Sequence, residues 1–501
     1  MRITLINVSS VLTSDGSRLI SALLKRAGHQ VNLVFLARSE PLNYEPFEFE
    51  PLEALLKNTD LAMIAVYSNY AVRAIQVTEY IHKKFPGMKV IWGGPHCIAA
   101  AEQSLRYADG VCFSEADFII TDLVNKIESG ADYLHTPNMA FLVNGSTIIN
   151  DVLPPYSDLD GLPYYDYDLD THFLLNNGLF NMTREAFKER CVAYPLYVPS
   201  FFFITSRGCI ENCSYCNNCR YVKMFGQNRM RYHSIDRIIA ELNHTIPQFG
   251  FFEFVAFGDD NFLMRPSEQL EDFAHKYKKN IGLPFAVCVS AKSYSEKKIR
   301  ILLDAGLKVV QMGVQSGSQR VIDDVYQRRI SVSKTQKIVR EMEPCLKERR
   351  MVVLLDFIID NPYENKNDIM KSYRYLIDLP KQVRINLFIL SFFPGTPIYD
   401  WALRDGFIQP FDEKTFKFYK KSAITYQVNY EMILIFIASL LQHDQQLSKY
   451  FPNIFLHALG STPLRAVASL FPKRFYAMLI RRLQLYFQKT TTKLFMTSKD
   501  I

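Results

Sequence analysis

The sequence has few cysteines, no long apolar run and no signal peptide pattern. Nine cysteines in 501 residues are far fewer than a secreted disulfide scaffold needs, and three of them crowd into one short segment, which favours a reducing, cytoplasmic compartment. The longest apolar run, Met432–Leu441, is about half of the ~20 residues that span a membrane, so it predicts a buried helix. The opening residues MRITLINVSS lack the apolar core of a secretory signal.

Positive charge is scarce outside the C-terminal end of the chain. From Ser461 to Ile501 there are eight Lys or Arg and one Asp, a balance that equals the net charge of +7 of the whole chain. The near-neutral remainder argues against a nucleic-acid-binding surface. The basic residues alternate with Leu, Phe and Tyr, so this stretch predicts either a contact with an anionic membrane or lipid-like substrate, or a solvated helix face.

The first 135 residues lack a dinucleotide-binding glycine pattern but alternate strands with helices. The segment after the first strand, Asn7–Gly16, contains one glycine, which excludes the usual NAD or FAD loop. The expected strands are Ile3–Val8, Val31–Phe35, Leu61–Val66, Lys89–Trp92 and Gly110–Phe113. This pattern predicts a doubly wound, Rossmann-like α/β domain, whose ligands would meet the loops at the carboxyl ends of its strands.

A second alternation of strands and helices predicts a partial, TIM-like (β/α)6 barrel over residues 199–410. Its expected strands are Phe202–Thr205, Phe251–Phe257, Phe285–Val289, Val309–Gly313, Val352–Ile359 and Ile385–Leu390. Residues 136–198, which include a Pro-, Asp- and Tyr-rich passage, are expected to be a linker. Residues 411–501 are expected to form a helical, basic C-terminal extension.

Three cysteines directly follow the first expected barrel strand. Cys209, Cys213 and Cys216 form a C-x3-C-x2-C pattern, and three thiolates can hold three irons of a four-iron four-sulfur cluster while the fourth iron stays open to another ligand. A structural zinc site needs a fourth ligand and usually a second, distant cysteine pair, which the sequence lacks. Cys219 could still complete a zinc site or a four-cysteine cluster, so these alternatives remain open.

The segment SRGC, with the aromatic Tyr215 before the last cysteine, resembles the motif of the radical S-adenosylmethionine (SAM) superfamily. The resemblance implies that the open iron binds SAM and that the reduced cluster cleaves it to a 5′-deoxyadenosyl radical. Further matching segments are FGDDNF, GVQSGS, FIIDNPYE and FPGTPIY, the last of which we interpret as a structural turn. The residues that the resemblance implies near SAM are Tyr215, Asp259, Asp260, Ser290, Lys292, Gln315 and Ser316. Gln315 replaces the more usual Glu, and Asp360 stands where glycine is common.

The N-terminal domain resembles the cobalamin-binding domain that precedes many such barrels. VIWGGPH follows its fourth expected strand and a Ser-Glu-Ala-Asp segment follows its fifth. The resemblance implies corrin contacts at Ser68, Gly93, Gly94 and Glu115, although ordinary turn and helix-capping roles remain an alternative. The D-x-H-x-x-G segment that donates an axial histidine elsewhere is absent, and His96 is interpreted as a hydrogen-bonding residue of the rim rather than an axial ligand.

Together these resemblances imply a cobalamin-dependent radical SAM enzyme that methylates an unactivated carbon of a small-molecule or lipid-like substrate. Its cofactors would be a four-iron four-sulfur cluster, SAM and cobalamin, and its electron donor an external protein such as flavodoxin or ferredoxin. Ring formation or rearrangement with the same cofactors is one alternative, and a non-enzymatic metal-binding protein with structural cysteines is another. The sequence predicts cytoplasmic localisation, with peripheral membrane contact through the C-terminal region.

Overall fold

The computed structural model describes residues 1–13, 15–38, 43–193, 196–226, 229–348, 350–409 and 424–496. The chain divides into two units, each built from several segments. Unit one comprises Met1–Val192, Tyr215–Phe252 and Phe392–Lys420, and unit two comprises Ala193–Ser214, Glu253–Ser391 and Lys421–Ile501. These divisions differ from the expected limits because segments far apart in the sequence join the same unit.

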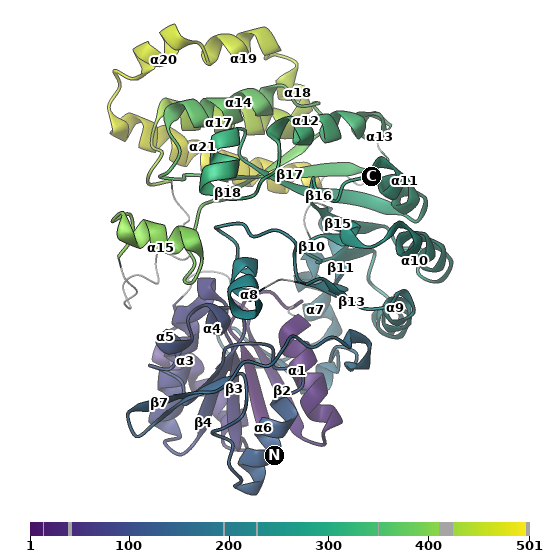
Figure 1. Ribbon diagram of the computed structural model, residues 1–501, viewed down its shortest axis with the longest axis vertical. Helices are drawn as coiled ribbons and strands as arrows, with labels where there is room; N and C mark the ends of the chain where they lie inside the picture. The colour runs from purple at the N-terminus through teal and green to yellow at the C-terminus, as the bar shows by residue number, and fades with distance from the viewer. Residues whose placement is uncertain are drawn as a thin grey trace. The chain divides into compact units, whose positions relative to one another are not determined.

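Unit one is built on a nine-stranded sheet, with the central strands in the order β2-β1-β3-β4-β5. These five strands are parallel: β1 (Arg2–Asn7), β2 (Gln30–Leu36), β3 (Leu61–Ala65), β4 (Lys89–Gly93) and β5 (Gly110–Cys112). The helices between them are α1 (Asp15–Arg26), η1 (Pro46–Leu52), α2 (Glu53–Leu56), η2 (Ser68–Tyr70), α3 (Ala71–Lys84), α4 (Pro95–Ala99), α5 (Ala101–Ser104) and α6 (Ile120–Ser129) (Figure 1). The doubly wound order reverses between β1 and β3, which is where such sheets place a ligand.

Four strands within residues 136–198, the segment expected to be a linker, instead extend this sheet at both edges. β6 (Met139–Val143) and β7 (Ser146–Ile149) continue it antiparallel beyond β5, and β8 (His172–Leu175) pairs parallel with β2 and antiparallel with β9 (Leu179–Asn181). The intervening passage is held by the buried Arg18, whose guanidinium donates to the carbonyl of Asp166 at 2.8 Å and lies 4.3 Å from the ring centre of Tyr167. The sequence pattern therefore did not predict these short strands, which lie between turn-forming residues.

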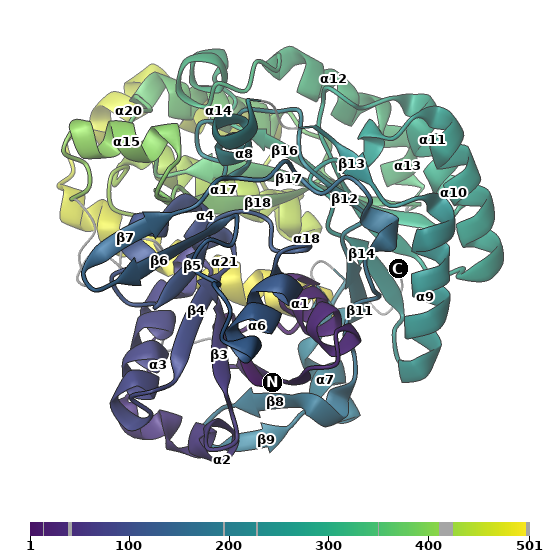
Figure 2. The ribbon, with the colours of Figure 1, turned by 60° about the horizontal axis from the view of Figure 1, so that its bottom comes forward.

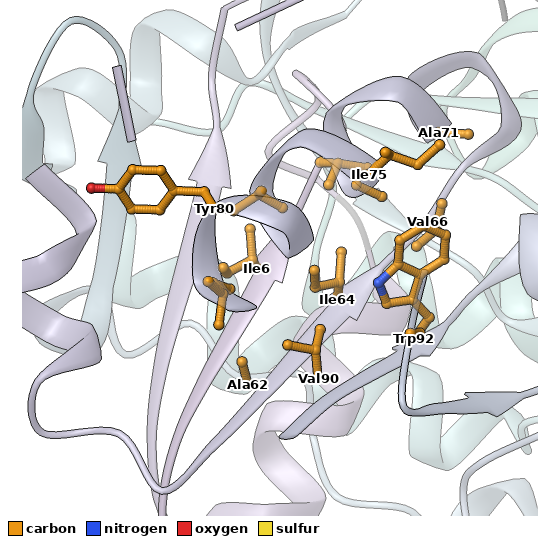
Figure 3. Close-up of a cluster of buried hydrophobic side chains, with 14 of the residues drawn as sticks. Ile6, Ala62, Ile64, Val66, Ala71, Ile75, Tyr80, Val90 and Trp92 are labelled. Atoms are coloured by element: carbon orange, nitrogen blue, oxygen red, sulfur yellow. The ribbon is translucent and has the colours of Figure 1, made fainter. Parts of the chain in front are cut away.

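The core of unit one lies between this sheet and α3. Ile64, Val90 and Trp92 of the sheet face Ile75 and Tyr80 of the helix, and all five side chains are buried (Figure 3). The indole nitrogen of Trp92 donates to the hydroxyl of Thr78 at 2.9 Å, so the one polar atom of this ring keeps a partner. Burial of each large apolar side chain contributes about 1.5–3 kcal/mol, which fixes the helix against the sheet.

Unit two contains a curled parallel half-barrel sheet, as the sequence predicts. The sheet has seven strands, with the two-residue β10 (Val192–Ala193) at one edge, and its six parallel strands follow one another in chain order: β11 (Val198–Phe203), β14 (Phe254–Phe257), β15 (Phe285–Val289), β16 (Leu307–Gln315), β17 (Val352–Ile359) and β18 (Arg384–Ile389). The helices of this region are η5 (Phe262–Met264), α10 (Ser267–Asn280), α11 (Glu296–Asp304), η6 (Val321–Val325), α12 (Val332–Glu341), α13 (Glu343–Lys347) and α14 (Lys366–Ile377) (Figure 2). β15 and β17 span the expected residues.

The remaining elements are short, with one exception. They are η3 (Leu159–Gly161), η4 (Leu169–Thr171), α7 (Arg184–Arg190), β10 (Val192–Ala193), β12 (Ser206–Arg207), α8 (Asn218–Phe225), β13 (Arg231–Tyr232), α9 (Ile235–Phe249) and α15 (Pro397–Arg404). The long helix α9 begins at a capping serine, because the side chain of Ser234 accepts the N–H of Arg237. It ends at Gly250, whose left-handed backbone terminates the helix.

The C-terminal part of unit two is helical. Its elements are α17 (Tyr430–His443), α18 (Gln445–Ser448), α19 (Asn453–Leu459), α20 (Thr462–Ala468) and α21 (Lys473–Met496). The apolar run Met432–Leu441 lies within α17, whose side chains are largely buried, so the expected buried helix is confirmed. In the described part of the chain, no helix combines the length and the apolar character that a membrane span requires.

Asp360 anchors this helical part to the end of β17. Its carboxylate is buried and accepts the backbone N–H groups of Thr425 at 2.9 Å, Tyr426 at 2.7 Å and Gln427 at 2.7 Å. Its φ of 59° lies in the left-handed region, which explains why glycine is common here, and aspartate tolerates that region better than most residues. The aspartate at position 360 therefore anchors residues 425–427 to the end of β17.

Replacing Asp360 by Gly separates its left-handed backbone conformation from the hydrogen bonds of its carboxylate. Glycine suits the backbone but removes the acceptor of three backbone N–H groups, one of them buried, so Asp360→Gly is expected to lower the free energy of unfolding by about 1–3 kcal/mol. The control is Gln327→Gly, at an exposed residue with φ 51°, which relieves the same backbone conformation without breaking an anchor. Thermal and urea unfolding measure both variants. Equal stability of Asp360→Gly and the unaltered protein would show that the carboxylate is not an anchor.

Candidate functional site

The cysteine loop crosses the division between the two units, between Ser214 and Tyr215. In unit two, Cys209 and Cys213 are buried, and burial raises the pKa of the Cys209 thiol to about 11, although a hydrogen bond from the Glu211 backbone opposes this shift. A bound iron would supply the positive charge that favours the thiolate. In unit one, Tyr215 and Cys216 are half-buried.

Cys219 lies one turn further on, in α8 of unit one. It is buried, and its N–H donates to the carbonyl of Cys216 at 3.2 Å. Within the described ranges, no three Cys, His, Asp or Glu side chains are already arranged as a metal site. The fit to a cluster therefore rests on the donor set, which is three thiols in one short loop.

Two contacts within unit two hold the part of the loop that carries Cys209 and Cys213. Glu211, which lies between them, is buried and accepts Lys292 Nζ at 2.6 Å and Ser290 Oγ at 2.9 Å. Ser214 donates its N–H to the carbonyl of Tyr326 at 3.0 Å. Ser290 and Lys292 are thus brought to the cysteine loop, and their expected proximity to SAM stays a prediction. The sequence analysis did not select Glu211, which lies between Cys209 and Cys213, because only the fold shows that Lys292 pairs with it.

Asp259 and Asp260 are adjacent in the sequence but have different surroundings. The Asp259 carboxylate accepts the N–H of Thr205 at 2.8 Å, the Thr205 hydroxyl at 2.6 Å and the Ser206 hydroxyl at 2.7 Å. Asp259 is only 1% exposed, and burial raises its pKa. Asp260 is exposed. Asp259 therefore positions the segment that leads into the cysteine loop, whereas Asp260 can be reached by a ligand.

Gln315 and Ser316 also have different surroundings. Ser316 is buried and donates to Glu364 Oε1 at 3.0 Å, with the Ser372 hydroxyl 3.2 Å away. Gln315 is half-buried with φ 71°, and within the described residues its amide makes no hydrogen bond. At Gly317 a Cβ atom would lie 2.6 Å from the Cα of Ser372, so only glycine lets the loop approach α14. Gln315 is the available polar group here, and Ser316 positions the loop.

Asn261 is a candidate ligand contact that the sequence analysis did not select. Its side-chain oxygen accepts the hydroxyl of Ser293 at 2.6 Å and the N–H of Ser290 at 3.4 Å. Its side-chain nitrogen is buried and has no hydrogen-bond partner among the described residues. A buried donor without a partner is uncommon and points to an acceptor supplied by a ligand. Its place in the FGDDNF segment was the available signal.

In unit one, the loops after β1, β3 and β4 meet at the rim where the strand order reverses. The Ser10 and Tyr70 hydroxyls lie 3.1 Å apart, and the Ser68 hydroxyl lies 3.0 Å from His96 Nδ1. His96 is 1% exposed, and burial lowers its pKa to about 4, so it is neutral. These facts favour the hydrogen-bonding interpretation of His96. Gly94 has φ 100°, and a Cβ there would lie 2.9 Å from the Val66 carbonyl oxygen, so the tight turn requires glycine.

The loop after β5 carries Glu115, the expected corrin contact, next to Ser114. Glu115 is engaged by Arg231, with side-chain distances of 2.5 and 2.8 Å, and by the N–H of Tyr156 at 3.0 Å. It therefore clamps the Tyr156 segment rather than lying free at the rim. The Ser114 hydroxyl beside it is buried without a hydrogen-bond partner among the described residues. Ser114 and the half-buried Gly93 fit a ligand at this edge, on the side of the sheet where a corrin would lie.

Part of this chain is similar in sequence to a known protein family and to two known methyltransferases. Residues 203–376 match the family model of the radical SAM superfamily. An uncharacterized methyltransferase of Pyrococcus horikoshii is 21% identical over 376 residues, which cover 73% of this chain and 74% of that protein. The cytidylyl-2-hydroxyethylphosphonate methyltransferase of Streptomyces wedmorensis is 24% identical over 228 residues, 44% of this chain and 40% of that protein.

Two solved structures share the fold. The radical SAM methyltransferase TsrM from Kitasatospora setae, solved with cobalamin and a four-iron four-sulfur cluster, has a TM-score of 0.61 and 13% identity over 81% of this chain and 75% of that chain. The cobalamin-dependent SAM radical enzyme OxsB has a TM-score of 0.59 and 15% identity over 81% of this chain and 55% of that chain. The expected fold class, a Rossmann-type domain followed by a half-barrel, is confirmed.

Glu364 predicts how stability changes with pH. Burial raises its pKa to about 8, so the folded state keeps the proton at pH values where the unfolded carboxyl has lost it. The contribution of this bound proton to the free energy of unfolding is fully present below about pH 4.5. It decreases by up to ~1.4 kcal/mol per pH unit as the pH rises, and it is lost above about pH 8. Glu364→Gln keeps a neutral hydrogen-bonding group. Its free energy of unfolding, relative to the unaltered protein, is expected to rise from pH 5 to 8 in denaturant titrations. Parallel curves for the two proteins would contradict this assignment.

Proposed function

We propose that this chain, which carries a radical SAM domain and has the fold of cobalamin-dependent radical SAM methyltransferases, methylates an unactivated carbon of a small-molecule or lipid-like substrate. The observation that carries the proposal is the cysteine loop, whose Glu211 is paired with Lys292 at the carboxyl end of the half-barrel. The two curated relatives are both named as methyltransferases, which favours methylation over ring formation or rearrangement. That alternative uses the same cofactors and differs in its product.

The proposal assigns each group of residues a task. Cys209, Cys213 and Cys216 would hold the cluster, while Asp260 and Gln315 would hydrogen-bond to SAM. When bound, the cluster supplies the electron that cleaves SAM, and cobalamin carries the methyl group. The chain itself orients these groups: Glu211, Asp259 and Ser316 fix the three loops by hydrogen bonds. An external electron donor such as flavodoxin or ferredoxin would complete the system.

Cobalamin would lie at the rim of unit one, where the loops after β1, β3, β4 and β5 meet. Ser68, Gly93 and Gly94 keep side chains small there, and Ser114 offers a buried hydroxyl. His96 is buried against Ser68, so we propose that no histidine of this loop ligates cobalt. Glu115 acts through its ion pair with Arg231 and shapes the loop instead of contacting the corrin.

Metal analysis of cysteine variants tests the cluster assignment. After anaerobic reconstitution with iron, sulfide and hydroxocobalamin, the unaltered chain is expected to hold about four irons, about four sulfides and one cobalt. Cys209→Ala, Cys213→Ala and Cys216→Ala are each expected to lose most of the iron and keep the cobalt, because the corrin residues are untouched. The matched control Cys219→Ala should retain the cluster. Zinc without sulfide in the unaltered protein would overturn the proposal.

The reaction is tested by products. With reductant, the reconstituted protein is expected to convert SAM to 5′-deoxyadenosine, and Cys213→Ala is expected to form none. Mass spectrometry of metabolites that accumulate with Cys213→Ala would identify the substrate. A product in which a methyl group replaces one hydrogen, heavier by CH2, supports methylation, whereas an isomer or a cyclised form of the substrate would support the alternative reaction instead.

A second proposal concerns the C-terminal surface, which we define as the exposed side chains of α19, α20, α21 and the segment 469–472 that joins α20 to α21. Its apolar side chains are strongly exposed, with Leu470 82% and Ile454 79% exposed. The other exposed apolar residues of this surface are Phe455, Leu464, Val467, Phe471, Phe475, Met478 and Leu485. The helix α21, which carries the last three of these residues, also exposes Lys473, Arg474, Arg481 and Arg482. Exposed apolar groups next to cations match an anionic lipid surface, so we propose peripheral membrane contact here.

Vesicle flotation tests this surface. The full chain is expected to float with vesicles containing phosphatidylglycerol and much less with phosphatidylcholine alone, and high salt should weaken the binding. Leu470→Ser/Phe471→Ser and Arg481→Glu/Arg482→Glu should each reduce flotation several-fold. The control is Phe47→Ser, an apolar residue that is 66% exposed in unit one. Unchanged flotation of both double variants, or self-association through this face in sedimentation, would overturn the membrane contact.

A further inference from the structure

The inner face of the half-barrel sheet carries a polar layer. On this face, Phe254, Val309 and Leu354 form a buried apolar cluster near the start of the strands. Two residues further along β16 and β17, on the same face, lie Gln311 and Asp356, and both are half-buried. Interiors of such barrels are usually filled by layers of branched apolar side chains, so a half-buried polar layer above an apolar one needs an explanation.

Four side chains from four neighbouring strands make this layer, which we call the inner-face cluster: Cys288, Gln311, Asp356 and Asn386. The strand register places Cys288 opposite Gln311 and Asp356 opposite Asn386. Gln311 Nε2 donates to the two Asp356 oxygens at 2.9 and 3.1 Å, and Asn386 Nδ2 donates to one of them at 2.9 Å. Cys288 Sγ lies 3.9 Å from Gln311 Oε1.

These contacts leave the cluster rich in acceptors. Both amide NH2 groups are directed to Asp356, so the acceptors that remain are the amide oxygen of Asn386, the second lone pair of the Gln311 oxygen, which accepts the Cys288 thiol, and the lone pairs of the carboxylate. Among the described residues, no Lys or Arg donates a hydrogen bond to Asp356. Burial raises the pKa of Asp356, and the nearby Arg328 opposes this while donating to the carbonyl of Gly313.

An ammonium group matches this set of acceptors. It carries three N–H donors and a positive charge, and would compensate a carboxylate that is otherwise costly to keep ionised inside a sheet. The next layer of the same face is apolar: Ile358 pairs with Phe388 in the register, and Phe388 is 49% exposed. A ligand with an ammonium group next to an aromatic or aliphatic part would therefore meet complementary groups in both layers.

We propose that the inner-face cluster binds a protonated amine of the substrate, with Asp356 as its counter-ion and Phe388 against the adjacent apolar part. The amine would donate to Asp356 and to the amide oxygens of Gln311 and Asn386. The role as substrate site rests on the proposed function, but the binding of amines does not depend on the cluster or on cobalamin. Asp356 is thus a specificity-determining residue, and the substrate class is a small amine with an apolar substituent.

Cys288 provides a reporter inside the proposed site. Methanethiosulfonates are expected to modify this half-buried thiol slowly, because burial raises its pKa to about 12, and peptide mass spectrometry of the full-length protein resolves it from the other cysteines. The cationic aminoethyl reagent is expected to modify Cys288 about tenfold faster than the anionic sulfonatoethyl reagent, because Asp356 attracts cations. Asp356→Asn should abolish the preference and Asn386→Asp should increase it. Asp304→Asn, an exposed residue at the end of α11, is the matched control and should change nothing.

Protection of Cys288 tests the ligand class. 2-Phenylethylamine should slow its modification by the neutral methyl methanethiosulfonate, whereas the isosteric 2-phenylethanol and 3-phenylpropionate should not. Asp356→Asn should need roughly tenfold more amine for the same protection, as expected for a lost charged hydrogen bond. Equal protection by all three compounds, or unchanged protection in Asp356→Asn, would overturn the proposal. Because the readout needs no metal, its failure would leave the cluster assignment untouched, and loss of the cluster would leave this result untouched.

Discussion

The pairing of buried carboxylates with donors from distant segments is the constraint on which the site depends. A buried carboxylate is tolerated only where hydrogen bonds or cations replace water. Glu211 meets this requirement with Ser290 and Lys292, and in doing so holds the cysteine loop against the strand that precedes them. Loss of one partner would leave a charge buried without compensation, so the loop conformation is strongly determined.

Carboxylates paired with donors from distant segments also hold other loops of the molecule. Asp259 ties the segment before the cysteines to the loop after β14, and Asp360 ties the C-terminal helices to the end of β17. In unit one, Glu115 holds the Tyr156 segment through Arg231. Each carboxylate lies just after a strand, where the backbone turns and a loop needs a fixed direction. Asp260, Gln315 and Ser114, which we propose as ligand contacts, are then presented by loops that other residues hold in place.

The two departures from the usual radical SAM motifs have different physical meanings. Both Gln315 and Asp360 have a left-handed backbone, with φ of 71° and 59°. At Asp360 the cost of that conformation is offset by three hydrogen bonds that a glycine could not make. Gln315 keeps a polar amide close to Gly313 and so retains hydrogen-bonding capacity without charge. The pairing of β16 with β17 shifts register between Gly313 and Gln315, whereas β17 pairs regularly with β18 up to Ile359, just before Asp360.

The sequence by itself determined the elements whose signals are local: the alternation of strands and helices in both parts, the buried helix over Met432–Leu441, and the cysteine spacing. Such patterns depend on neighbouring residues and survive without knowledge of the fold. Only the tertiary structure decided that residues 136–198 extend a sheet, that Glu211 meets Lys292, and that Asp356 joins Gln311 and Asn386 on one face. Those contacts join residues many positions apart, and side chains of the same type, such as Asp259 and Asp260, receive different roles only from what packs around them.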